Sequence, residues 1–171
     1  MTSFFKSEAG QAAVLSLYDQ KLQDLGIDYQ SKTVRTQFGE THLLVTGPID
    51  GPPLMIVHGS NGCAPIGLET YPNLSKKYRV YAVDVLAQPN KSKGERLSMS
   101  DLSYGQWVNE LLIKLGLEGV TLAGFSLGGL IILKTLAFDE SRIKAAYLAA
   151  PAYIVNGNPL KLLWKMFIPM K

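Results

Sequence analysis

The chain has 171 residues, of which 47% are hydrophobic and 9% aromatic, and it carries a net charge of +3. This length and composition predict a single globular domain and argue against a disordered or membrane-spanning chain. Because Lys161, Lys165 and Lys171 account for the whole net charge, residues 1–150 have no broad basic face, and nucleic acid is not an expected partner.

The cysteine content and the N-terminal residues indicate the cellular compartment of the protein. Cys63 is the only cysteine in the sequence, so an internal disulfide framework is excluded, and inert packing is the expected role of this thiol. Residues 1–6 lack the apolar stretch of a secretory signal. We therefore expect a cytoplasmic protein. No cluster of residues in the sequence indicates a metal site or an organic cofactor.

The chain opens with a predicted amphipathic helix and a hairpin. The helix spans residues 7–25, with Ser7 as its N-cap and Gly26 as its C-terminal stop. Residues 1–28 are therefore assigned to an N-terminal helix that packs on the core. Two extended runs, residues 29–37 and 41–46, follow on either side of a glycine-containing turn and predict a hairpin at the start of a sheet. The core-facing residues of the predicted N-terminal helix recur at three- and four-residue spacing and are Val14, Leu15, Tyr18, Leu22 and Leu25.

Short apolar runs then alternate with longer helical segments. Further strands are predicted at residues 54–57, 79–85, 120–125 and 143–150, and helices at about 67–76, from Ser100 or Asp101 to Gly116, and from Leu127 to Asp139. This alternation predicts an α/β fold over residues 29–151, in which a mostly parallel sheet of six strands is covered by helices on both faces. The core-facing residues of the middle helix are expected to be Leu102, Trp107, Leu111, Leu112 and Leu115.

The most informative stretch is Gly124-Phe125-Ser126-Leu127-Gly128, between an apolar strand and an apolar helix. This is the context of a nucleophile elbow, in which a sharp turn presents a serine hydroxyl at the positive end of a helix. Such a reversal strains the backbone of Ser126 and leaves room only for very small side chains at Gly124 and Gly128. A glycine-rich turn in some other α/β domain is the alternative.

With these segments identified, the chain resembles the α/β-hydrolase superfamily, and it is most similar to bacterial carboxylesterase-like members that begin with an extra N-terminal helix. Residues 124–129 match the nucleophile motif, and residues 58–60 match the His-Gly-x loop after the third strand. Residues 83–92 stand where the family has an Asp-x-x-Gly-x-Gly-x-Ser-like loop, with Ala87 and Asn90 in place of both glycines. Asparagine tolerates positive φ better than most residues, so this loop is expected to persist with an altered shape.

The resemblance implies the parts of a catalytic site. Ser126 would be the nucleophile, and the backbone N–H groups of Leu127 and Ser60 would form the oxyanion hole. His58 and Gly59 would hold the oxyanion loop by bonds to the backbone.

Three further residues receive modest roles. Asn61 is a candidate for orienting the oxyanion loop or for touching substrate. Asp84, at the end of a strand, has a structural place in the family. His42 lies in a hairpin strand and is expected to be a surface or packing residue.

The acid and base of the family's triad are missing from the sequence. The family order is serine, then Asp or Glu, then His, but the only acids after Ser126 are Asp139 and Glu140, and no histidine follows it. A serine without a base is a poor nucleophile. The chain therefore looks like the N-terminal part of a longer hydrolase whose triad Asp and His lie beyond residue 171. A short protein that has lost catalysis is the competing interpretation.

Residues 152–171 are expected to begin a lid, with a helix that starts near Asn158 and is apolar almost all round. This helix and the edge of the last strand would lie exposed in the isolated chain. The 171-residue chain is therefore expected to self-associate. Because it lacks the triad acid and base, it is also expected to be inactive by itself.

The expected function is that of a serine hydrolase, a carboxylesterase for small or medium acyl esters that uses no cofactor. Two alternatives stay open. The same fold supports acyl transfer, C–C bond hydrolysis and haloperoxidase-like chemistry, which the elbow does not separate. The second alternative is a catalytically silent module of the same fold that binds a ligand or another protein.

Overall fold

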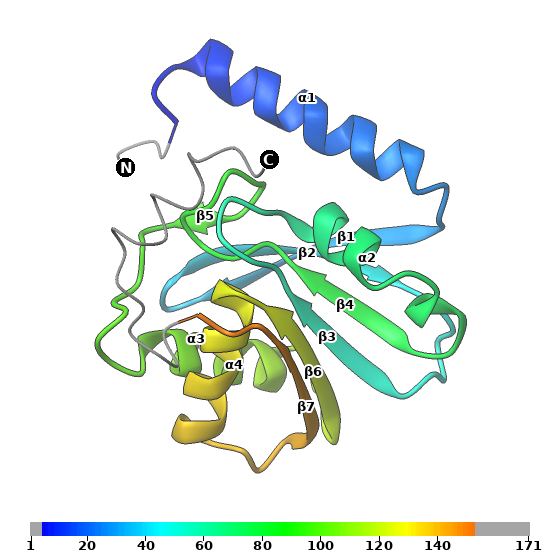
Figure 1. The fold of residues 1–171 in the computed structure, drawn as a ribbon, viewed down its shortest axis with the longest axis vertical. Coiled ribbons are helices and arrows are strands. Elements are labelled where there is room, and N and C mark those ends of the chain that lie inside the picture. The colour runs from blue at the N-terminus through cyan, green and yellow to red at the C-terminus, as the bar shows by residue number, and fades with distance from the viewer. Residues whose placement is uncertain (1–4, 153–171) are drawn as a thin grey trace, which may run out of the picture.

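The structure of the protein is a computed structural model that describes residues 5–152 (Figure 1). The predicted helix near Asn158 lies outside the described residues, as does all but the first residue of the predicted lid segment. Within residues 5–152, no helix is both long and apolar enough to cross a membrane. The helices are α1 (Glu8–Asp24), α2 (Ala64–Thr70), the 3₁₀ turn η1 (Leu74–Lys76), α3 (Ser103–Lys114) and α4 (Leu127–Phe138).

One sheet organises these helices. Its strands are β1 (Tyr29–Thr36), β2 (Gly39–Thr46), β3 (Pro53–Val57), β4 (Arg79–Val83), β5 (Lys93–Gly94), β6 (Val120–Phe125) and β7 (Ile143–Ala149). The strand order is β1-β2-β4-β3-β6-β7, and the short β5 pairs with β2 outside this path. The predicted α/β fold class is confirmed, and β5 is a strand that the sequence analysis did not anticipate.

The sheet combines an antiparallel hairpin with a parallel half. β1 and β2 pair antiparallel from Tyr29 opposite Thr46 to Thr36 opposite Gly39, and β2 pairs antiparallel with β4. β3 pairs parallel with β4 and β6, and β6 pairs parallel with β7. Because β3, β4, β6 and β7 run in one direction, their carboxyl ends meet at a single edge. Ligands of open α/β sheets bind at such an edge.

Helices cover both faces of the sheet, as predicted. In Figure 1, α1 and α2 lie on one side of the sheet, and α3 and α4 lie together on the other. The predicted amphipathic helix is α1, with the Ser7 hydroxyl accepting a hydrogen bond from the backbone N–H of Gly10 at 3.1 Å. Tyr18 and Leu22 are its buried residues, and they pack against β2, β3 and β4 in one apolar cluster.

Two helix predictions need correction. The helix predicted at residues 67–76 begins earlier and is split, because Pro65 fits only the first turn of α2 and the residue before Pro72 is disfavoured in helical conformation. Leu102 was expected in the core but is 38% exposed. It precedes the first residue of α3, where the carboxylate of Asp101 accepts hydrogen bonds from the backbone N–H and hydroxyl of Ser103.

Candidate active site

Ser126 lies between β6 and α4 in a strained backbone conformation, with φ of 52° and ψ of −117°. A non-glycine residue in such a region costs on the order of 1–3 kcal/mol, so the surrounding structure must hold it. The Ser126 N–H donates to the carbonyl of Ala149 at 3.0 Å, and its carbonyl accepts from the N–H groups of Leu130 at 3.2 Å and Ala152 at 2.9 Å. The end of β7 and the first turn of α4 therefore hold the turn on both sides.

Three glycines allow the strand and the helix to pack this closely. A Cβ on Gly124 would lie 2.8 Å from the backbone carbon of Gly128, and a Cβ on Gly128 would overlap the carbonyl of Val57. Both positions thus exclude any side chain, as expected for an elbow. Gly129 is a third such position, because its Cβ would lie 2.7 Å from the Cβ of Pro151. The sequence contained this glycine, but only the fold shows its contact with the segment after β7.

The loop after β3 lies against the elbow. A Cβ on Gly59 would be 2.7 Å from the ring of Phe125, and a Cβ on Gly128 would be 2.9 Å from the carbonyl of His58. Ser60 is exposed at the tip of this loop, and Ser126 is half-buried beside it. The fold therefore brings the loop of residues 58–60 and the turn of residues 124–128 together at the carboxyl edge of the sheet.

His58 is fully buried and uses both ring nitrogens within the loops. Its Nε2 accepts a hydrogen bond from the backbone N–H of Val85 at 3.0 Å, which assigns the ring proton to Nδ1, and Nδ1 donates to the carbonyl of Gly59 at 2.7 Å. Burial lowers the pKa of His58, so the ring stays neutral. With both nitrogens bonded to the backbone, this histidine has no free nitrogen for a serine hydroxyl.

Asn61 joins this loop to the next one. It has a φ of 56°, and its backbone N–H donates to Oε1 of Gln88 at 2.7 Å. Its side chain is exposed. The sequence analysis missed Gln88. No pattern in the neighbouring sequence indicates that its side chain accepts a hydrogen bond from a loop 27 positions earlier.

The loop at residues 84–92 keeps its place without its two family glycines. Ala87 adopts a positive φ of 53°, whereas Asn90 does not. Asn90 supports the loop through its side chain. Asn90 donates to the carbonyl of Val85 at 2.9 Å and accepts from the N–H of Ser92 at 3.0 Å. The amide of Asn90 thus braces the loop internally, and it also lies 3.3 Å from Nε2 of His58.

His42 is neither a surface residue nor simple packing, which corrects the sequence analysis. It is only 6% exposed, and its Nδ1 lies 2.8 Å from Oδ2 of the fully buried Asp84. Its Nε2 lies 2.8 Å from the hydroxyl of Ser31. Both nitrogens are therefore occupied on the α1 side of the sheet. No sequence pattern pairs a hairpin residue with the end of β4, because the contact depends on the β2–β4 register.

No group in the described part of the chain is arranged to deprotonate Ser126. No side chain within residues 5–152, the two histidines included, forms a hydrogen bond with its hydroxyl. Cys63 is buried at the N-cap of α2, where burial raises the pKa of its thiol to about 11, so it is a poor nucleophile at neutral pH. No three metal-ligating side chains cluster within the same residues.

Comparison with curated proteins identifies two relatives in Bacillus subtilis. The carboxylesterase nap is 34% identical to this chain over 135 residues, which cover 79% of this chain and 45% of nap. The carboxylesterase YbfK is 35% identical over 138 residues, which cover 79% of this chain and 46% of YbfK. The chain thus spans a little less than half the length of the curated relatives it matches.

A solved structure and a family model agree with these relatives. The crystal structure of naproxen esterase from Bacillus subtilis is similar with a TM-score of 0.82 and 30% identity, covering 95% of this chain and 57% of that chain. The family model for the alpha/beta hydrolase fold matches residues 52–169, which contain β3, the loop at residues 58–60 and the elbow. The chain therefore belongs to the α/β-hydrolase fold family.

Proposed function

We propose that the protein is a serine hydrolase, a carboxylesterase that cleaves small or medium acyl esters through an acyl-enzyme on Ser126. The observation that carries this proposal is the strained conformation of Ser126 between β6 and α4, held by hydrogen bonds from both sides. Strain of this kind is stable only when the surroundings impose it, and it is typical of a serine that must be presented at the surface of the turn.

The oxyanion hole is assigned to two backbone donors. Leu127 is the first residue of α4, so its N–H has no acceptor within the helix and lies at the positive end of the helix dipole. The N–H of Ser60 is supplied by the loop packed against Phe125, and it forms no hydrogen bond within the described residues. Each donor aimed at a developing oxyanion stabilises the transition state by about 3 kcal/mol.

The triad acid and base are assigned to sequence that follows residue 171. Two findings support this step of the proposal. His42 and His58 have both ring nitrogens engaged elsewhere, and the chain matches less than half the length of its carboxylesterase relatives. In the longer protein a histidine would take the hydroxyl proton of Ser126 as the bond to the ester carbonyl carbon forms, and would return it to the leaving alcohol.

A fluorophosphonate probe tests the nucleophile directly. The protein encoded by the complete gene should become covalently labelled, and Ser126→Ala should abolish the labelling. Ser60→Ala is the matched control, because it removes an exposed serine hydroxyl of the same site but keeps the backbone N–H. Labelling that persists in Ser126→Ala would refute the assignment of the nucleophile.

Hydrolysis of p-nitrophenyl esters of increasing acyl length tests the substrate class. Release of p-nitrophenol from short and medium chains, lost in Ser126→Ala, is the expected result. Absence of both labelling and hydrolysis in the complete protein would favour the catalytically silent module instead. Transfer of the acyl group to an added alcohol or amine in preference to water would favour acyl transfer.

A further inference from the structure

Asp84 collects hydrogen bonds from four segments of the chain. Its carboxylate is fully buried at the end of β4. Oδ1 accepts from the backbone N–H of Ala64 at 2.6 Å, and Oδ2 lies 2.8 Å from Nδ1 of His42, 3.1 Å from the hydroxyl of Tyr18 and 3.4 Å from the N–H of Lys91. A buried carboxylate needs such donors to offset the loss of water, so these four segments depend on one another.

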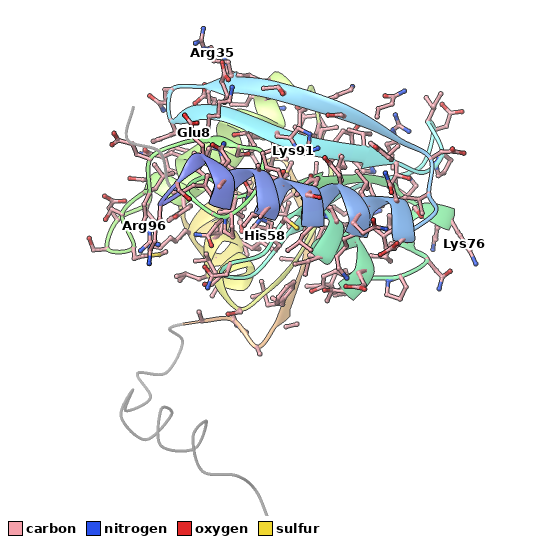
Figure 2. The ribbon with its side chains drawn as sticks, turned by 90° about the horizontal axis from the view of Figure 1, so that it is seen from above. Glu8, Arg35, His58, Lys76, Lys91 and Arg96 are labelled. Atoms are coloured by element: carbon pink, nitrogen blue, oxygen red, sulfur yellow. The ribbon has the colours of Figure 1, made fainter. Side chains whose placement is uncertain are left out.

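Tyr18 is the contribution of α1 to this group. It is 3% exposed, and burial together with the negative charge of Asp84 raises its pKa, so the hydroxyl stays protonated and donates. The amine of Lys91 lies 4.6 Å from the centre of the Tyr18 ring and 2.6 Å from the carboxylate of Asp19. Figure 2 shows Lys91 beside α1, which lies across the sheet. The helix is thus bound to the loop that follows β4 by polar contacts as well as by packing.

The same loop holds the segment that carries Ser60. Three of the hydrogen bonds that join them link the Val85 N–H with Nε2 of His58 at 3.0 Å, the Asn61 N–H with Oε1 of Gln88 at 2.7 Å, and the Ala64 N–H with Oδ1 of Asp84 at 2.6 Å. His58 and Cys63 at the two ends of this segment are buried, whereas Ser60 and Asn61 at its tip are exposed. Directional hydrogen bonds therefore determine the position of the tip.

We propose that Tyr18 is a positioning residue of the candidate site, acting through Asp84 on the loop of residues 58–63 that presents the Ser60 N–H. Without the Tyr18 hydroxyl, the carboxylate of Asp84 loses one donor and recovers solvation by moving or by admitting water. Either change weakens its bond to the N–H of Ala64 and loosens the loop. The kinetic consequence of this inference rests on the proposed function, whereas the effect on the loop does not.

Hydrogen–deuterium exchange of the complete protein tests the effect on the loop. In Tyr18→Phe, the amides of Asn61 and Ala64 should exchange about tenfold faster, the size expected when a hydrogen bond to a charged group is lost, while the amides of β3 stay protected. Tyr78→Phe is the matched control, since Tyr78 packs against the same apolar cluster and its hydroxyl forms no hydrogen bond in the described structure. Unchanged exchange at residues 61–64, or a uniform increase over the whole chain, would overturn the proposal.

Steady-state ester hydrolysis tests the effect on the reaction. An oxyanion donor acts in the transition state, so Tyr18→Phe should lower kcat about tenfold with KM unchanged, and Tyr78→Phe should change neither. A loop that loosens with no change in kcat would show that Tyr18 does not position the oxyanion donor. If the complete protein hydrolyses no ester, the proposed function fails, and the exchange measurement alone decides whether Tyr18 holds the loop.

Discussion

The face of the sheet beneath α3 and α4 is packed almost entirely by apolar side chains, whereas the face beneath α1 and α2 buries the hydrogen-bonded group around Asp84. On the first face, Trp107, Leu111 and Ile131 are fully buried, and the indole N–H of Trp107 donates to the Thr41 hydroxyl at 2.8 Å. On the second face, Asp84 joins α1, the first residue of α2, the β1–β2 hairpin and the loop after β4.

The two parts of the candidate site are therefore held in place by different interactions. Apolar burial is strong but non-directional, so it holds α4 and the elbow against the sheet while glycines set their closest approach. The tip of the loop that carries Ser60 is exposed, and hydrogen bonds with defined directions hold it. The turn at Ser126 thus depends on packing together with its own backbone hydrogen bonds, and the loop opposite it depends on a buried polar group.

Gly128→Ala should have the largest effect, because its Cβ would overlap the Val57 carbonyl and separate the turn of residues 124–128 from the loop of residues 58–60. We expect a loss of about 3 kcal/mol in the free energy of unfolding and no labelling by a fluorophosphonate. Chemical denaturation and labelling are the measurements. Gly116→Ala is the control, because its Cβ meets nothing within 4 Å; its φ of 65° limits the loss to about 1 kcal/mol. Equal losses in both variants would contradict the prediction.

Leu111→Ala tests the apolar face away from the site. Leu111 is fully buried in α3, so the cavity left behind should lower the free energy of unfolding by about 3 kcal/mol. Leu17→Ala in α1 is the matched control, since Leu17 is 71% exposed and its loss should change stability by less than about 0.5 kcal/mol. Urea denaturation gives both values. A small effect at Leu111 would mean that this face is not the main source of stability.

His58→Gln tests the loop through the pH dependence of stability. Burial lowers the pKa of His58 in the folded state, so the unfolded chain binds the additional proton below about pH 6.5. The free energy of unfolding should therefore fall as the pH drops below this value, by up to about 1.4 kcal/mol per pH unit from this group, until the lowered folded pKa is reached. The difference between wild type and His58→Gln isolates this contribution. A constant difference between pH 8 and pH 5 would contradict it.

Substitutions on the two edge strands of the sheet should have the smallest effect, a change in self-association. We predict that the isolated 171-residue chain self-associates, because β7 has no further strand beside it within residues 5–152 and exposes Tyr147. Tyr147→Lys should lower the mean mass measured by light scattering, whereas Thr33→Lys on the opposite edge strand, β1, should leave it unchanged. A monodisperse monomer of the wild-type chain would contradict this prediction.

Sequence and structure agree best where the determining interactions are local. The elbow and the strands β3, β6 and β7 follow from apolar runs and a glycine spacing that can be read within about ten residues. The predicted start of α2 is three residues too late, because Pro65 suits the first turn of a helix and the helix begins at Ala64. Ala87, and not Asn90, takes the positive φ, because the side chain of Asn90 is needed to brace the loop.

The sequence by itself determined the order of the longer strands and helices, though not β5, together with the position of Ser126 in a strand–turn–helix motif and the lack of any histidine after it. Periodicity and backbone sterics act over a few residues, and this makes them visible in a single sequence. Only the tertiary structure decided that His42 is buried against Asp84 and that Tyr18 reaches the same carboxylate. These partners are 42 and 66 positions apart, so their meeting depends on strand register and helix docking, which no local pattern encodes.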